Sequence, residues 1–150
     1  MSWVEDRLEI LDLLARYSHA ADGLEPEAYA DCFMDDGVFH GRVGMPDEMK
    51  IEGREKLLRW TGALMKNRNG RQTRHIQTNT IFEEQGPERA VTRTYLLVMT
   101  TEGAKAPEPG LTSVYRDEIV KTPRGWRIKL RQALPDRQGV LPRRREAGQE

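Results

Sequence analysis

The segment Val4–Ala21, VEDRLEILDLLARYSHAA, indicates an amphipathic helix, and a carboxylate, Asp22, directly follows it. Asp22 follows Ser18 by four residues, so it continues the apolar stripe, and we expect its side chain to point into the core. Gly23 predicts the end of the helix, because glycine commonly follows the last helical turn. The rest of the predicted buried stripe repeats at helical spacing: Leu11, Leu14, Ala15 and Ser18.

A carboxylate at position 22 is unfavourable for two reasons. An acidic side chain in the last turn of a helix faces the negative end of the helix dipole, which disfavours its charge by about 0.3–1 kcal/mol. Burial disfavours the charge further. The position therefore predicts either a positive partner for Asp22 or a use for its proton. The alternative is that Asp22 is a solvated residue of the turn Ala21-Asp22-Gly23-Leu24.

Length and composition indicate one domain of ordinary size, since 150 residues can bury most of a hydrophobic core. The 24 basic and 24 acidic residues cancel, so we expect neither nucleic acid nor an anionic membrane as a partner. No run reaches the length of a membrane span, and the first residues lack the basic-then-apolar order of a signal peptide. A single cysteine, Cys32, excludes an internal disulfide. These features predict a cytoplasmic protein in which Cys32 packs as a small apolar residue.

The apolar spacing changes from helical to strand-like along the chain. Before residue 70 it predicts a helix, two short strands and another helix: Pro26–Phe33, Val38–Val43, Met49–Glu52 and Arg54–Lys66. After residue 73 the period is two, and four runs rich in β-branched and aromatic residues predict strands: Arg74–Glu83, Arg89–Thr101, Leu111–Thr122 and Gly125–Ala133.

Three helices followed by antiparallel strands predict an α+β fold with the helices packed on one face of the sheet. A long, twisted sheet should curl around the helices and leave a pocket between the layers. We assign residues 1–134 to this domain. Residues 135–150 lack periodicity and predict a mobile tail, and we interpret its run Arg143-Arg144-Arg145 as a solvated end rather than a nucleic-acid site.

The first of these strands carries a histidine on a polar face. Alternation places His75, Gln77 and Asn79 on one side, and it places Ile76, Thr78, Thr80 and Phe82 on the other. The polar side faces either solvent or a polar pocket. In a pocket His75 would meet Asp22, because the first helix packs on this sheet. The carboxylate would then fix the imidazole tautomer and make His75 a better general base.

Several short motifs, taken in order and spacing, carry a family resemblance over about residues 4–133. They are Ile10-Leu11-Asp12-Leu13-Leu14-Ala15-Arg16-Tyr17 with Asp22-Gly23; Phe33-x-x-Asp36-Gly37-Val38-Phe39; Gly53-Arg54-Glu55; Arg74-His75-x-x-x-Asn79; Tyr115-x-Asp117-Glu118; and Gly125-Trp126-Arg127-Ile128-x-x-Arg131. The chain resembles the SnoaL-like branch of the NTF2-like superfamily. This resemblance implies a cone in which three N-terminal helices pack on a strongly curved, mostly antiparallel sheet.

The resemblance also implies a site. Three superfamily members, scytalone dehydratase, bile-acid 7α-dehydratase and hexachlorocyclohexane dehydrochlorinase, use a helix aspartate and a strand histidine as a dyad in elimination reactions. The dyad falls on Asp22 and His75. Tyr17 would donate a hydrogen bond to a carbonyl or leaving oxygen, or simply pack, and Arg131 would stabilise developing anionic charge. The implied substrate-binding residues are Phe39, Asn79, Leu96, Val98 and Tyr115.

Two features depart from this pattern. The stretch Leu96–Met99 has no ionisable residue where two of these enzymes carry a second histidine or aspartate, which predicts a more apolar pocket. Alternation also places Arg131 on the strand face opposite Trp126, Ile128 and Leu130. Either those three apolar residues cover a subunit interface, which predicts a homodimer or homotrimer, or the role given to Arg131 is wrong.

We therefore expect a cofactor-independent lyase of the dehydratase type, which abstracts a carbon-bound proton from a small hydrophobic cyclic molecule. An isomerase or a polyketide cyclase would need the same base. A non-catalytic ligand-binding module, or a subunit like the β subunit of aromatic-ring dioxygenases, would not need it. His19 and Asp22 are three residues apart and have no third metal ligand at suitable spacing, so we expect a site without metal.

Overall fold

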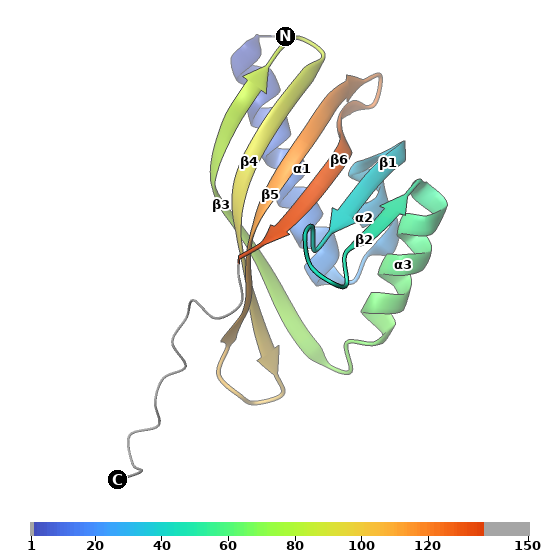
Figure 1. Cartoon of the computed structure of the whole chain (residues 1–150), viewed down its shortest axis with the longest axis vertical. Helices are drawn as coiled ribbons and strands as arrows, with labels where there is room; N and C mark the ends of the chain where they lie inside the picture. The colour runs from blue at the N-terminus through green and yellow to red at the C-terminus, as the bar shows by residue number, and fades with distance from the viewer. Residues whose placement is uncertain (1, 137–150) are drawn as a thin grey trace.

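The computed structural model describes residues 2–136 (Figure 1). The N-terminal half contains three helices: α1 (Trp3–Gly23), α2 (Pro26–Asp31) and α3 (Arg54–Lys66). A capping box starts α1, because the Ser2 hydroxyl accepts a hydrogen bond from the Glu5 backbone while the Glu5 carboxylate accepts one from the Ser2 backbone. The helix ends on Leu24, which adopts a left-handed conformation with φ of 61°. The left-handed residue that ends the helix is thus Leu24, one residue after the predicted position at Gly23.

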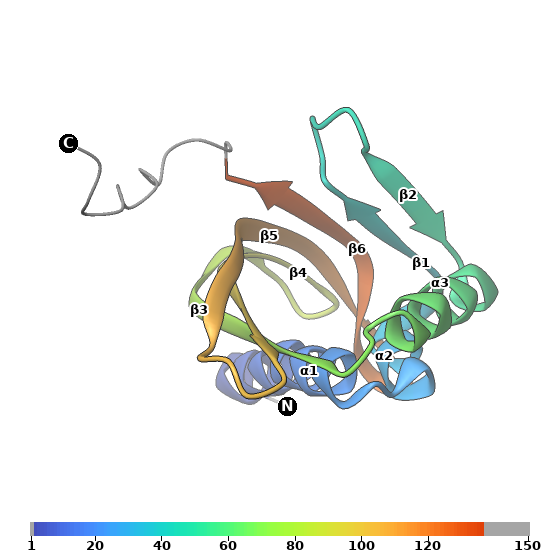
Figure 2. The same ribbon diagram turned by 90° about the horizontal axis from the view of Figure 1, so that it is seen from below.

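The strands form one sheet in the order β2-β1-β6-β5-β4-β3. Every neighbouring pair is antiparallel except β1 and β6, which run parallel. Figure 2 shows the sheet curving from β3 to β6 around α1, with α3 beside β1 and β2. This arrangement confirms the predicted α+β cone. The strands are β1 (Phe33–Gly41), β2 (Met49–Glu52), β3 (Arg71–Gln85), β4 (Arg89–Glu102), β5 (Glu108–Thr122) and β6 (Gly125–Pro135).

Pairing between strands explains why several elements differ in length from the sequence-based prediction. Phe33 pairs with Ile128 of β6, so β1 begins five residues earlier than expected and α2 is correspondingly short. Cys32, just before β1, is buried, and its thiol donates a hydrogen bond to the Ala28 carbonyl at 3.4 Å. β6 extends through Pro135, the first residue of the tail expected at 135–150, and residues 137–150 of that predicted tail lie outside the described residues.

The buried face of α1 is wider than the predicted stripe, because the helix contacts β3 on one side and α2 and β6 on another. Leu14 and Ser18 are buried as expected, whereas Leu11 and Ala15 are exposed. The core face instead consists of Ile10, Leu13, Leu14, Tyr17, Ser18, Ala20 and Ala21. Within residues 2–136, no helix has the length and apolar character needed to cross a membrane.

A β-bulge in β3 reverses the side-chain alternation after His75. Thr78 pairs with Tyr95 and Ile81 pairs with Arg93, so Asn79 and Thr80 together face one residue of β4. Asn79 has a φ of 56°, a conformation that asparagine adopts more readily than most residues. The prediction that Asn79 shares the inner face with His75 is therefore wrong. Thr80 takes the inward place, and Phe82 packs against the core.

A second bulge, in β6, resolves the alternation problem of Arg131. Glu118 pairs with Leu130 while its neighbour Ile119 pairs with Ile128, so Lys129 is an extra residue in its strand. Trp126 and Ile128 before the bulge and Arg131 after it all point inward and are buried. Trp126 and Ile128 therefore do not cover a subunit interface, whereas Leu130 is only partly buried, and the homodimer or homotrimer stays a prediction.

Candidate active site

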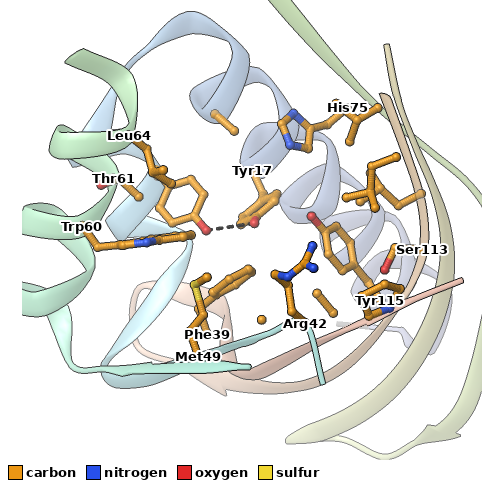
Figure 3. A pocket seen from close by; sticks show the side chains of 18 of the residues that line it. Tyr17, Phe39, Arg42, Met49, Trp60, Thr61, Leu64, His75, Ser113 and Tyr115 are labelled. Atoms are coloured by element: carbon orange, nitrogen blue, oxygen red, sulfur yellow. Dashed lines mark hydrogen bonds between the residues drawn. The ribbon is translucent and has the colours of Figure 1, made fainter. Parts of the chain in front are cut away.

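A cavity of about 250 Å³ lies between the curved sheet and the helices. Figure 3 shows side chains from all three helices and from the sheet converging on it. Phe39 and Trp60 stack in its wall with ring centroids 4.9 Å apart. The wall is mainly apolar, as the sequence predicts, and the expected binding residues Phe39, Leu96, Val98 and Tyr115 all line it.

Asp22 and His75 lie in direct contact at one side of this cavity. The last turn of α1 carries Asp22, and β3 carries His75. The His75 Nδ1 atom lies 2.7 Å from Asp22 Oδ1. The backbone N–H of His75 donates to the other carboxylate oxygen at 2.8 Å. Both Asp22 oxygens are therefore bound by one residue, which fixes the carboxylate relative to the strand.

The surroundings of Asp22 keep it ionised. Burial alone would raise its pKa, but the hydrogen bonds from the His75 ring and backbone and from the Thr73 hydroxyl outweigh that effect and lower the pKa. The Thr73 hydroxyl donates to Asp22 Oδ1 at 2.9 Å. Arg68 donates to Thr73 and, at 3.0 Å, to the carbonyl of Ala21, so a guanidinium lies near the end of α1. This cation lies at the negative end of the helix dipole and is linked to Asp22 only through the Thr73 hydroxyl, so the direct partner of the carboxylate is His75.

The lowered pKa of Asp22 predicts a pH-dependent contribution to stability. A carboxyl whose pKa is lower in the folded state than in the unfolded state stabilises the fold fully above the unfolded value, about 3.9, and loses this effect as the pH falls through the folded value. We expect Asp22→Asn to be less stable than the wild type at pH 6, and the difference to shrink below about pH 4. Urea unfolding between pH 3 and pH 6 measures this difference. Asp12→Asn, which removes an exposed carboxylate of the same helix, controls for the loss of one negative charge.

An ionised Asp22 determines the tautomer of His75. A carboxylate only accepts hydrogen bonds, so Nδ1 of His75 must carry the hydrogen, and Nε2 of the neutral ring has a free lone pair. His75 lines the cavity, and within residues 2–136 no hydrogen bond reaches Nε2. Figure 3 shows the imidazole at the edge of the pocket. The arrangement presents a basic nitrogen to whatever fills the cavity.

Three buried tyrosines line the cavity together with His75. The hydroxyls of Tyr17 and Tyr29 lie 2.8 Å apart, and the rings of Tyr17 and Tyr115 meet edge to face with centroids 6.0 Å apart. Burial raises the pKa of Tyr17 and Tyr115 well above the usual value, so both hydroxyls keep their protons. Tyr29 was not selected from the sequence, because nothing local shows that its hydroxyl reaches Tyr17.

Arg131 lies behind two of these tyrosines and does not line the cavity. Its Nε and one terminal nitrogen donate to Asp117 at 2.8 Å each, and both side chains are fully buried. Its Cζ atom lies 3.9 Å from the centroid of the Tyr17 ring and 4.2 Å from that of Tyr115. Burial would lower the pKa of Arg131, but Asp117 raises it by more, so the charge persists. Arg131 therefore does not reach the cavity surface, and its cation contacts the tyrosine rings, while its expected role in stabilising anionic charge stays a prediction.

Gln77 joins the helix, the strand and Arg131. Its side-chain nitrogen donates to the Leu14 carbonyl at 2.8 Å and to the Ser18 hydroxyl at 2.7 Å. Its side-chain oxygen accepts from Arg131 at 3.3 Å. The sequence placed Gln77 on the correct face of β3 but showed no partner for it. These bonds hold α1 against β3 at Leu14 and Ser18.

The remaining candidates lie away from the cavity. Asn79 is exposed and its side chain accepts a hydrogen bond from the adjacent Thr78, so it does not line the pocket. His19 is exposed on α1, and His40 Nε2 contacts Glu48 at 2.6 Å. Among the described residues, no three His, Cys, Asp or Glu side chains are grouped as metal ligands would be.

Comparison with known proteins places the chain in a structural context. The family model described as a SnoaL-like domain matches residues 3–132. A variant of Rv3472, a protein of unknown function from Mycobacterium tuberculosis, is 28% identical with a TM-score of 0.78, covering 90% of this chain and 73% of that one. A Catenulispora acidiphila protein solved in complex with S-DNPA is 29% identical with a TM-score of 0.75, covering 87% of this chain and 92% of that one.

An NTF2-like protein with a cystatin-like fold from Novosphingobium aromaticivorans is 25% identical with a TM-score of 0.75, and the alignment covers 91% of this chain and 86% of that one. None of the curated proteins compared with the chain matches it. The matched region contains the elements from α1 to β5 and most of β6, together with Asp22 and His75. The match therefore includes most of the residues that line the cavity.

Proposed function

This chain belongs to the SnoaL-like family of NTF2-like proteins, which bind small molecules, and from that premise we propose that it is a lyase of the dehydratase type. In this proposal His75 abstracts a carbon-bound proton from a small hydrophobic cyclic substrate. One observation carries it: Asp22 binds Nδ1 of His75, so that Nε2 presents a lone pair to a mainly apolar cavity.

The proposed roles follow from the position of each group. Nε2 of His75 takes the proton, and Asp22 stabilises the imidazolium that forms. The electron pair of the broken C–H bond forms a C=C bond as the C–O bond breaks, and the imidazolium returns the proton to the departing oxygen, which leaves as water. Tyr17 donates a hydrogen bond to a carbonyl oxygen of the substrate, where negative charge develops. This sequence consumes no cofactor.

The same base would serve two neighbouring reactions. An isomerase would return the proton to a different carbon, and a polyketide cyclase would direct the enolate at a second carbonyl of the same molecule. The S-DNPA complex of the Catenulispora acidiphila protein supports the binding of a small molecule here, and it does not choose among these reactions. A purely ligand-binding protein would have no need of the oriented imidazole.

A screen of hydroxylated ketones, sterols and polyketides tests the proposal. We expect at least one compound to lose water in the presence of the wild-type protein. NMR and mass spectrometry measure the loss of substrate and the formation of the dehydrated product. The same compound carrying deuterium on the carbon next to its carbonyl should react more slowly, because that bond breaks. A compound that binds in the cavity but is converted equally fast with the wild type and with His75→Gln would contradict the proposed mechanism.

A further inference from the structure

Arg42 contributes a cationic side chain to an otherwise mainly apolar cavity wall. It directly follows β1, and Figure 3 shows its guanidinium pointing into the pocket. The cavity lining contains no aspartate or glutamate among the described residues. The side chain is 34% exposed, and its ionic partner among the described residues, Asp47, does not line the cavity, so no carboxylate of the wall faces the part of the guanidinium inside the cavity.

The loop after β1 holds Arg42 in place. Arg42 pairs with Asp47 through Nε at 2.6 Å, and that carboxylate lies mostly in solvent. Glu48 accepts from the Gly44 backbone at 2.6 Å and contacts His40 at 2.6 Å, which closes the loop. The backbone N–H of the next residue, Val43, donates to the Ala133 carbonyl at 3.0 Å. The loop is thus anchored to β6.

The terminal amino groups of Arg42 remain available. Its closest atom to Asp47 is Nε, and within residues 2–136 neither terminal nitrogen donates a hydrogen bond. The residue also adopts a left-handed conformation, with φ of 53°, which costs a non-glycine residue about 1 kcal/mol. Backbone strain of this kind is concentrated at functional sites, and here it accompanies a guanidinium directed into a cavity.

The two other basic groups of the wall are already engaged. Arg68 donates to Thr73 and to the carbonyl of Ala21. His75 binds Asp22 through Nδ1 and leaves only a lone pair at Nε2, which repels an anion. Arg42 is therefore the group of the described wall that is best placed to receive a negative charge.

We propose that the ligand of this cavity is a cyclic apolar molecule bearing a carboxylate, with the carboxylate bound by the terminal nitrogens of Arg42 and the ring packed on Phe39 and Trp60. A planar guanidinium whose two terminal nitrogens are free can donate two parallel hydrogen bonds to one carboxylate, one to each oxygen. A doubly charged phosphate would need more than this one cation. The proposal deepens the proposed function, on which it rests, by naming the class of substrate as a ring-containing carboxylic acid.

A matched pair of probes tests the charge requirement. 1-Naphthylacetate and 1-naphthylacetamide share ring and length and differ in one negative charge. At pH 7 we expect the wild type to bind the acid at least about tenfold more tightly than the amide, the scale of one charge-assisted hydrogen bond. Arg42→Gln should remove this preference and leave amide affinity unchanged. Titration calorimetry measures both affinities, and quenching of Trp60 fluorescence, absent in Trp60→Phe, reports occupancy of the cavity.

Two further variants test whether the positive charge of Arg42 itself sets this preference. Arg42→Lys retains the charge and should retain part of the preference, which excludes a mere change in loop structure. Arg68→Gln removes the second guanidinium of the wall and should leave the preference intact. Equal affinity for acid and amide, binding of neither probe, a preference that survives Arg42→Gln, or one lost in Arg68→Gln would each overturn the proposal.

His75→Gln distinguishes this proposal from the proposed function. The preference for the acid should persist in this variant, because Arg42 and not His75 binds the carboxylate. Loss of dehydration chemistry with an intact acid preference would count against the lyase alone. Dehydration of an uncharged substrate, with no preference for the acid probe, would count against the carboxylate site alone.

Discussion

Replacing His75 with alanine is expected to lower turnover at least about a hundredfold, which is the low end of what a general base contributes. The fold should survive, since His75 lies at the cavity wall and not within the packed core. Turnover of the substrate identified by screening, together with the urea midpoint, measures both effects. His19→Ala is the matched control, because His19 is an exposed histidine of α1 with no place at the cavity.

Asp22→Asn should produce a loss of similar size for a different reason. An amide can offer its NH₂ group to Nδ1 of His75, which would favour the tautomer with a hydrogen on Nε2 and remove the lone pair that takes the proton. It also removes the charge that stabilises the imidazolium. Normal turnover in Asp22→Asn or in His75→Ala on the true substrate would contradict the mechanism.

Asp117→Asn is expected to lower the free energy of unfolding by about 3–5 kcal/mol, the usual cost of removing one partner of a buried ion pair. Asp117 and Arg131 are both fully buried, so the change leaves the Arg131 charge without its carboxylate. One terminal nitrogen of Arg131 already has no hydrogen-bond partner among residues 2–136, and no acidic group within that range replaces Asp117. Urea unfolding at pH 7 measures the change.

Two comparisons show whether the charge causes this loss. Glu118→Gln alters the adjacent carboxylate of β5, which lies on the outer face 3.7 Å from Arg89, and should cost less than about 1 kcal/mol. The double variant Asp117→Leu with Arg131→Met removes both charges and should recover most of the lost stability. A double variant as unstable as Asp117→Asn would show that packing around Tyr17 and Tyr115, and not the unpaired charge, controls stability here.

Local patterns in the sequence predicted most of the elements but not where their alternation reverses. The helix of residues 54–66 and the strand of residues 49–52 have the predicted bounds, since each depends on its own spacing and end signals. The bulges at Asn79 and Lys129 arise only when a strand pairs with a partner of unequal length. The presence of asparagine at position 79 was a local signal for the bulge in β3, because asparagine adopts the left-handed conformation more readily than most residues. No comparable signal marked the second.

The candidate site shows the same division between local and tertiary information. A carboxylate on the inner side of a helix end and a histidine on a polar strand face were legible in the sequence, and they lie 2.7 Å apart in the structure. The sequence could not identify Tyr29 and Gln77 as residues of the site, because their hydrogen-bond partners are 12 or more residues away along the chain. The position of Arg42 at the cavity could not be predicted either, since the orientation of its side chain depends on a turn with a left-handed residue that is anchored to β6.

The sequence by itself determined the succession of helices and strands, because periodicity and helix-end chemistry are local properties. Its motifs, taken in order, carried the family resemblance that placed the dyad on Asp22 and His75. Tertiary structure alone decided that Arg131 lies buried behind Tyr17 and Tyr115, and that Asn79 points outward. The physical reason is that side chains alternate along a strand with period two, so one extra residue in a paired strand transfers every later side chain to the other face.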